Sequence, residues 1–96
     1  NYPNPFNPDI EGHTTIAFVL DQDAEIDIEM FSITGAAVKE ITVGSFRTAG
    51  EHQSDIWTGV NGVGRTVLPG TYFCRIIARY SDGREESFRR KIAVVR

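Results

Sequence analysis

The sequence predicts an all-β domain in which short antiparallel strands pack as a two-sheet sandwich. Several segments alternate apolar and polar residues with a period of two, which is typical of strands that bury one face. Turn-forming residues separate these segments at short intervals, and no segment has the pattern of a long helix. The 96 residues predict a single domain, long enough to enclose a real core.

The chain opens with a proline-rich segment, Asn-Tyr-Pro-Asn-Pro-Phe-Asn-Pro. Proline fixes φ and lacks a backbone donor, so this segment can form neither a helix nor a central strand. We expect residues 1–12 to form an extended leader that ends in a polar turn and packs on the domain. Tyr2 and Phe6 are the predicted aromatic anchors of this leader.

The first two strands are predicted at residues 13–20 and 24–31, joined by a turn at residues 21–23. The second has the clearest alternation in the chain, because Ile26, Ile28 and Met30 alternate with acidic residues. This pattern predicts one buried face and one acidic, solvated face. Gly35 then allows the positive φ that a turn often needs.

The middle strands are predicted at residues 37–43, with Val38 in the core, and at residues 50–57, which end at Trp57. Residues 45–47 are expected to form a short edge strand between them. Residues 58–65 contain three glycines and therefore predict a loop.

The last two strands are predicted at residues 71–80 and 85–95. In the first of them, the face with Tyr72 and Cys74 is the expected core, because Arg75 and Arg79 occupy the other face. The Asp-Gly pair at residues 82–83 predicts a tight type I′ hairpin between the two strands. Together the elements predict an immunoglobulin-like (fibronectin III-like) antiparallel β-sandwich of about seven strands.

Composition excludes several classes of protein. The net charge is −3 and the isoelectric point about 5.3, whereas nucleic-acid-binding domains are usually basic. No apolar run approaches the roughly 20 residues of a transmembrane helix. The single cysteine excludes an internal disulfide.

No group of residues has the spacing of a catalytic or cofactor site. Cys74 lies on the predicted core face, where cysteine behaves as a small apolar residue. His13 and His52 lie far apart, whereas a zinc site needs three or four ligands. We therefore expect a protein that is not an enzyme and that has no cofactor.

Two charged runs are candidate binding sites. Asp21, Asp23 and Glu25 are weak candidates for calcium, which prefers several carboxylate oxygens; the alternative is a solvated strand face that discourages edge pairing. Positive charges gather in the last hairpin, and they are either the protection of an edge strand or a recognition surface for an acidic partner. These residues are Arg84, Arg89, Arg90, Lys91 and Arg96.

Several short motifs, in their order and spacing, resemble those of a known family. They are Asn1 to Pro8, Thr14-Thr-Ile16, Phe31-Ser-Ile-Thr-Gly35, Gly50-Glu-His52, Trp57-Thr-Gly59, Pro69-Gly-Thr-Tyr-Phe73 and Arg90-Lys-Ile-Ala-Val-Val-Arg96. With these motifs the chain resembles the immunoglobulin-like domain of flagellar hook-capping proteins. It looks equally like the C-terminal sorting domain of type IX secretion cargo.

The closing apolar strand with its basic end and the opening proline motif favour the sorting domain. The resemblance implies a non-catalytic C-terminal module of a larger secreted or cell-surface bacterial protein, exported across the envelope and recognised by the secretion machinery or by neighbouring domains. The expected alternatives are a structural assembly module that self-associates, and then a calcium- or carbohydrate-binding accessory domain.

Overall fold

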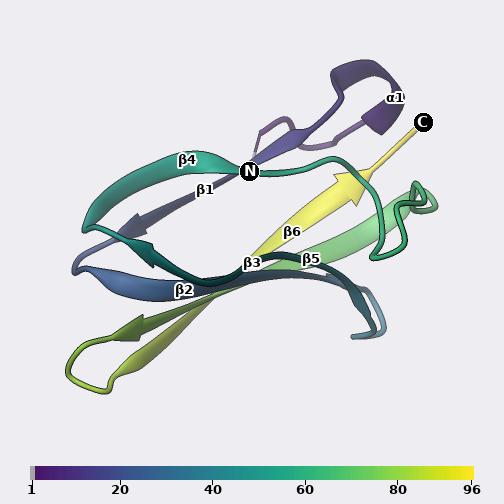
Figure 1. The fold of residues 1–96 in the computed structure, drawn as a ribbon. Coiled ribbons are helices and arrows are strands. Elements are labelled where there is room, and N and C mark those ends of the chain that lie inside the picture. Colours follow the sequence, from purple (N-terminus) through teal and green to yellow (C-terminus); the bar gives the residue numbers. More distant parts are fainter. Residues whose placement is uncertain (1) are drawn as a thin grey trace.

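The computed structural model describes residues 2–96 as two antiparallel sheets packed face to face (Figure 1). The elements are α1 (Pro8–Glu11), β1 (Thr14–Leu20), β2 (Ala24–Ser32), β3 (Ala37–Arg47), β4 (Gly50–Trp57), β5 (Gly70–Tyr80) and β6 (Glu85–Val94). One sheet pairs β1 with β4, and the other has the order β3-β2-β5-β6. The predicted all-β, immunoglobulin-like sandwich is confirmed.

The strand boundaries agree closely with the predicted ones, except at β3. Residues 37–43 and 45–47 were predicted as two strands, but they form one continuous strand. Gly44 adopts a φ of 59°, and its backbone N–H donates to Oδ1 of Asp27 on β2 at 2.7 Å. The chain therefore passes through this residue without leaving the sheet, although its register with β2 shifts.

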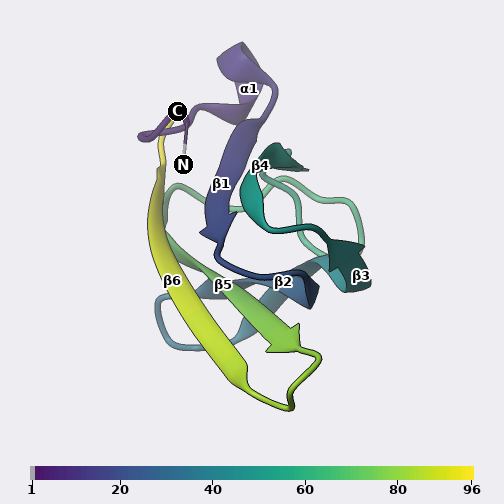
Figure 2. The same cartoon turned by 90° about the vertical axis from the view of Figure 1, so that its left-hand side faces the viewer.

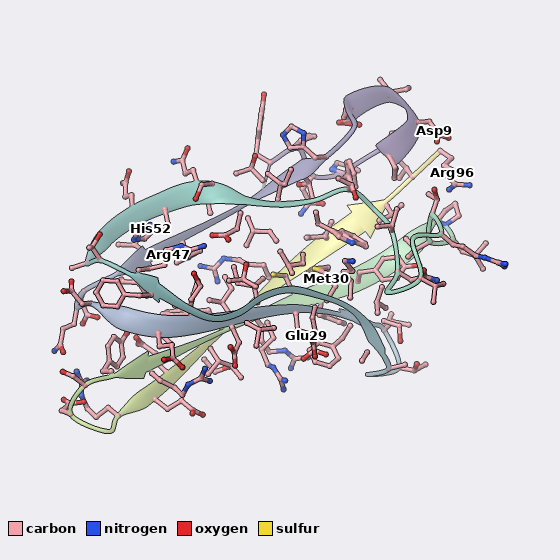
Figure 3. All side chains as sticks on the ribbon, viewed as in Figure 1. Asp9, Glu29, Met30, Arg47, His52 and Arg96 are labelled. Carbon is pink, nitrogen blue, oxygen red and sulfur yellow. The ribbon has the colours of Figure 1, made fainter. Side chains whose placement is uncertain are left out.

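The alternating residues of β2 and β5 face the core as predicted. Ile26, Ile28 and Met30 are fully buried, and so is Cys74 on β5. Figure 3 labels Met30 between the two sheets and Glu29 on the opposite face of β2. The period of two thus assigned the correct face to both central strands.

A polar link joins β3 to β4 across the side of the sandwich. Oδ1 of Asp55 on β4 accepts hydrogen bonds from the Thr42 hydroxyl at 2.9 Å and from the Arg47 guanidinium at 2.8 Å, both on β3. Asp55 is only 7% exposed, and its Oδ2 has no partner among the described residues. A buried carboxylate needs such partners, because an unpaired buried charge is strongly destabilising.

Candidate functional site: the clasp between the leader and the last strand

The leader crosses from one sheet to the other (Figure 2). The backbone of Tyr2 exchanges two hydrogen bonds with Thr15 on the free edge of β1, at 3.0 and 2.6 Å. Four residues later, the Phe6 N–H donates to the Ala93 carbonyl oxygen at 2.7 Å, and the Val95 N–H donates to the Phe6 carbonyl oxygen at 2.9 Å. The leader therefore occupies the position of a seventh strand that bridges the two sheets. Asn1 lies outside the described residues.

Asn4 extends this pairing with its side chain. Its Nδ2 donates to the Lys91 carbonyl oxygen at 2.7 Å, and its Oδ1 accepts from the Ala93 N–H at 3.0 Å. The side-chain amide thus takes the place of a peptide group, which lets a segment rich in proline pair with a strand edge. Together, Asn4 and Phe6 cover the edge of the chain from Lys91 in β6 to Val95 just after it. We call this pairing the clasp.

Phe6 anchors the clasp from within the core. Its side chain is fully buried, and its ring centroid lies 6.1 Å from that of Trp57. Gly59 lies so close that a Cβ atom there would approach Pro8 Cγ to 2.6 Å and the Phe6 ring to 3.2 Å. Trp57 in turn lies 5.6 Å from the Tyr72 ring. Residues of three separate sequence motifs therefore meet at one point.

Two hydrogen bonds hold the aromatic rings of this cluster in place. The Trp57 Nε1–H donates to the Val60 carbonyl oxygen at 2.9 Å, and the Tyr72 hydroxyl donates to the Leu68 carbonyl oxygen at 2.6 Å. Burial raises the pKa of the Tyr72 hydroxyl, so it remains a donor at neutral pH. The loop at residues 58–69 is thereby tied to the aromatic cluster around Phe6.

The expectation that Tyr2 is an aromatic anchor was wrong. Tyr2 is 78% exposed and anchors the leader only through its backbone. The expected polar turn at the end of the leader is one helical turn, Pro8–Glu11. Asn7 caps this turn, since its Oδ1 accepts from the Asp9 N–H at 3.0 Å, and Pro8 at its start has no donor to lose.

The five cations of the predicted recognition surface are all exposed, but they do not share one surface. Arg84 lies in the β5–β6 hairpin, where its Nε donates to Oδ2 of Asp82 at 2.7 Å. Arg96 lies at the opposite end, 3.8 Å from Oδ2 of Asp9 in α1 (Figure 3). These two cations have carboxylate partners within their own end of the domain.

The three cations between them alternate along β6. Arg89 and Lys91 pair with Arg75 and Phe73 of β5, on the outer face of the four-stranded sheet. Arg90 points to the other side and lines a groove between β6 and the edge of β1. An acidic partner would therefore meet either the outer face or this groove, which are opposite sides of the strand.

The three calcium candidates have three different protein partners. Asp21 accepts from the Tyr80 hydroxyl at 3.4 Å, Asp23 accepts from the Ala49 N–H at 2.8 Å, and Glu25 pairs with Arg79 at 3.2 Å. Within residues 2–96, no group of three or more His, Cys, Asp or Glu side chains is placed to hold a metal ion. Calcium binding by these residues stays a prediction.

Arg79 also shapes the acidic face of β2. Its Nη1 donates to Oδ2 of Asp27 at 2.8 Å, and this bond, with that from Gly44, lowers the pKa of the Asp27 carboxyl. The outer face of the sheet is therefore a set of partly exposed ion pairs rather than a bare acidic surface.

Cys74 and His52 lie in separate surroundings, the first in the core and the second against Phe18. Cys74 is fully buried, and burial raises the pKa of its thiol to about 12. His52 stacks on Phe18 with ring centroids 5.3 Å apart, and its Nε2 lies 2.6 Å from the Thr48 carbonyl oxygen. A buried neutral thiol with no adjacent base is a poor nucleophile.

Comparison of the chain with protein-family models and with curated proteins finds no match. Among the described residues, no helix is long and apolar enough to cross a membrane.

Proposed function

We propose that this domain is the non-catalytic C-terminal immunoglobulin-like module of a larger secreted or cell-surface bacterial protein, and that it serves as a type IX secretion sorting or anchoring signal. The observation that supports the proposal is the pattern of burial along β6. Its apolar residues Ile92 and Val94 are buried, while three consecutive cations before them are exposed. A receptor can contact these cations while the domain stays folded.

The clasp is what makes β6 a fixed target. The leader pairs with the strand from Lys91 onward, whereas the β6 edge at residues 85–90 has no strand beside it among the described residues. The backbone that carries the exposed side chains is thus held by the leader and by β5, next to an available edge. Charged groups on such a surface mainly speed the encounter with a partner of opposite charge.

The experiment fuses the domain to the C-terminus of a reporter that carries a signal peptide, in a host with type IX secretion. Arg89→Gln, Arg90→Gln and Lys91→Gln are combined in one variant. Deletion of residues 91–96 is avoided, because it would remove two buried core residues and unfold the domain. The control is Arg65→Gln, which changes an exposed cation in the loop after β4.

We expect the triple variant to keep its far-ultraviolet circular dichroism and thermal midpoint but to accumulate inside the cell envelope. The Arg65→Gln fusion should reach the cell surface or the medium as the parent fusion does. Normal export of a folded triple variant would contradict the role of these cations.

A structural assembly module, as in a hook cap or a surface filament, is the second candidate function. Its supporting observation is the outer edge of β3, which pairs with no strand among residues 2–96, since such edges can pair between subunits. Light scattering over a range of concentrations separates the two candidates. A mass that rises with concentration supports assembly, and a constant monomer mass supports the sorting role.

A further inference from the structure

A second candidate surface lies on the outer face of the four-stranded sheet, where the end of β2 and the turn that follows it, residues 32–35, approach β5 and β6. A groove of about 470 Å³ opens there, with Phe31, Phe73, Arg75 and Arg89 along it. We propose that this groove binds an acidic segment of a partner protein, with a carboxylate between the two arginines and an apolar neighbour against Ile33. The inference does not rest on the proposed secretion role.

The two arginines are held in place by the sheet and by aromatic rings. Arg75 and Arg89 are directly opposite each other on β5 and β6. The Arg75 guanidinium lies 4.6 Å from the centroid of the Phe31 ring, and that of Arg89 lies 5.0 Å from the centroid of the Phe73 ring. Stacking on a ring fixes the plane of a guanidinium and leaves its N–H edge free for a carboxylate.

The positive charge of the two arginines is only partly balanced within residues 2–96. Glu29 pairs with Arg75 at 3.5 Å, but no carboxylate among residues 2–96 lies within ion-pair distance of Arg89. Like charges directly opposite each other in a sheet are destabilising. Nε of Arg75 is also buried, and it has no hydrogen-bond partner among the described residues. A bound carboxylate would relieve the repulsion between the two guanidinium groups.

The surroundings favour a polypeptide over an acidic sugar. Sugars bind to open aromatic faces, whereas here a guanidinium already lies over each phenylalanine ring. Ile33, in the loop that borders the groove, is 68% exposed and offers an apolar contact beside the arginines. A glutamate or aspartate next to an apolar side chain matches this arrangement of charge and apolar surface.

The test titrates the ¹⁵N-labelled domain with an acetylated, amidated peptide that contains Glu-Asp-Phe, while NMR follows the backbone and arginine side-chain signals. The matched probe is the same peptide with Gln-Asn-Phe. Inorganic phosphate and oligogalacturonate are titrated separately. The variants are Arg89→Gln in the groove and Arg84→Gln in the hairpin, which changes an exposed arginine outside it.

We expect saturable, salt-sensitive shifts at residues 32–35, Phe73 and Arg89 with the acidic peptide and none with the amide peptide. Arg89→Gln should weaken binding about tenfold, the loss of one charge-assisted contact, and Arg84→Gln should not. The absence of saturable shifts at millimolar acidic peptide would overturn the proposal. So would equal binding by Arg89→Gln, or binding of phosphate or oligogalacturonate as tight as that of the peptide.

Discussion

The Phe6 N–H donates to the Ala93 carbonyl oxygen at 2.7 Å, so the sixth residue of the chain pairs with the last strand. This bond and that from the Val95 N–H to the Phe6 carbonyl oxygen at 2.9 Å tie the leader to the end of β6. The order of β6 therefore depends on the leader as well as on β5. Any partner that binds β6 therefore contacts a surface that the leader helps to order.

Replacing Phe6 with alanine should destabilise the domain strongly. The ring is fully buried against Trp57, and truncation of a buried phenylalanine costs roughly 3 to 5 kcal/mol of unfolding free energy. Urea denaturation followed by tryptophan fluorescence measures this loss. Tyr2→Ala is the matched control and should change stability by about 0.5 kcal/mol or less, because Tyr2 is mostly exposed. Equal losses for the two variants would show that Phe6 is not the anchor.

Gly59→Ala should be more destabilising than Gly64→Ala, although the two glycines have nearly the same φ, 79° and 84°. The backbone penalty of a positive φ is about 1 kcal/mol in both variants. At Gly59 the new Cβ would also lie 2.6 Å from Pro8 Cγ, whereas at Gly64 it meets nothing within 4 Å. We expect an additional loss of about 1 to 3 kcal/mol for Gly59→Ala, measured by thermal unfolding. No difference between the variants would contradict the close packing of the leader on this loop.

Asp55→Ala should cost about 3 kcal/mol or more, because it leaves the Arg47 guanidinium without its carboxylate at a mostly buried position. Asp27→Ala is the matched control, since it removes a partly exposed partner of Arg79 and should cost about 1 kcal/mol or less. The double variant Arg47→Met and Asp55→Leu should recover part of the loss, because no charge is left unpaired. Chemical denaturation measures the stability of the three variants. A double variant less stable than Asp55→Ala would refute the claim that the unpaired Arg47 charge causes the loss.

Cys74 should not react with a thiol reagent at pH 8 in the folded domain and should react fully in denaturant. Burial raises the pKa of the thiol from 9.0 to about 12. The thiol of the unfolded chain loses its proton at a lower pH than that of the folded domain. The contribution of Cys74 to stability is therefore fully present below pH 9 and is lost as the pH rises toward 12. Cys74→Ala should therefore show a shallower loss of stability between pH 9 and 11 than the parent, in unfolding curves measured across that range. Fast labelling of the native domain would contradict the burial of Cys74.

The sequence alone determined which face of each central strand is buried. Ile26, Ile28 and Met30 follow a period of two, and such alternation reports the orientation of side chains within one strand. It also determined the position of the hairpin turn at residues 81–84 but not its type. The predicted type I′ turn is wrong, because only Gly83 has a positive φ (88°) and its N–H donates to the Tyr80 carbonyl oxygen at 3.1 Å. Tyr2 and Phe6 were both predicted as anchors of the leader, and only Phe6 is buried, so the sequence did not separate the two.

Tertiary structure alone decided which distant residues meet. The convergence of Phe6, Trp57 and Gly59 depends on the packing of one sheet on the other, which no local pattern encodes. The five cations form one group in sequence, but alternation along β6 sends Arg90 to the opposite side from Arg89 and Lys91. The groove at Arg75 and Arg89 likewise requires the register of β5 with β6. Local patterns set the direction of a side chain within its own strand, whereas pairing and packing set its neighbours.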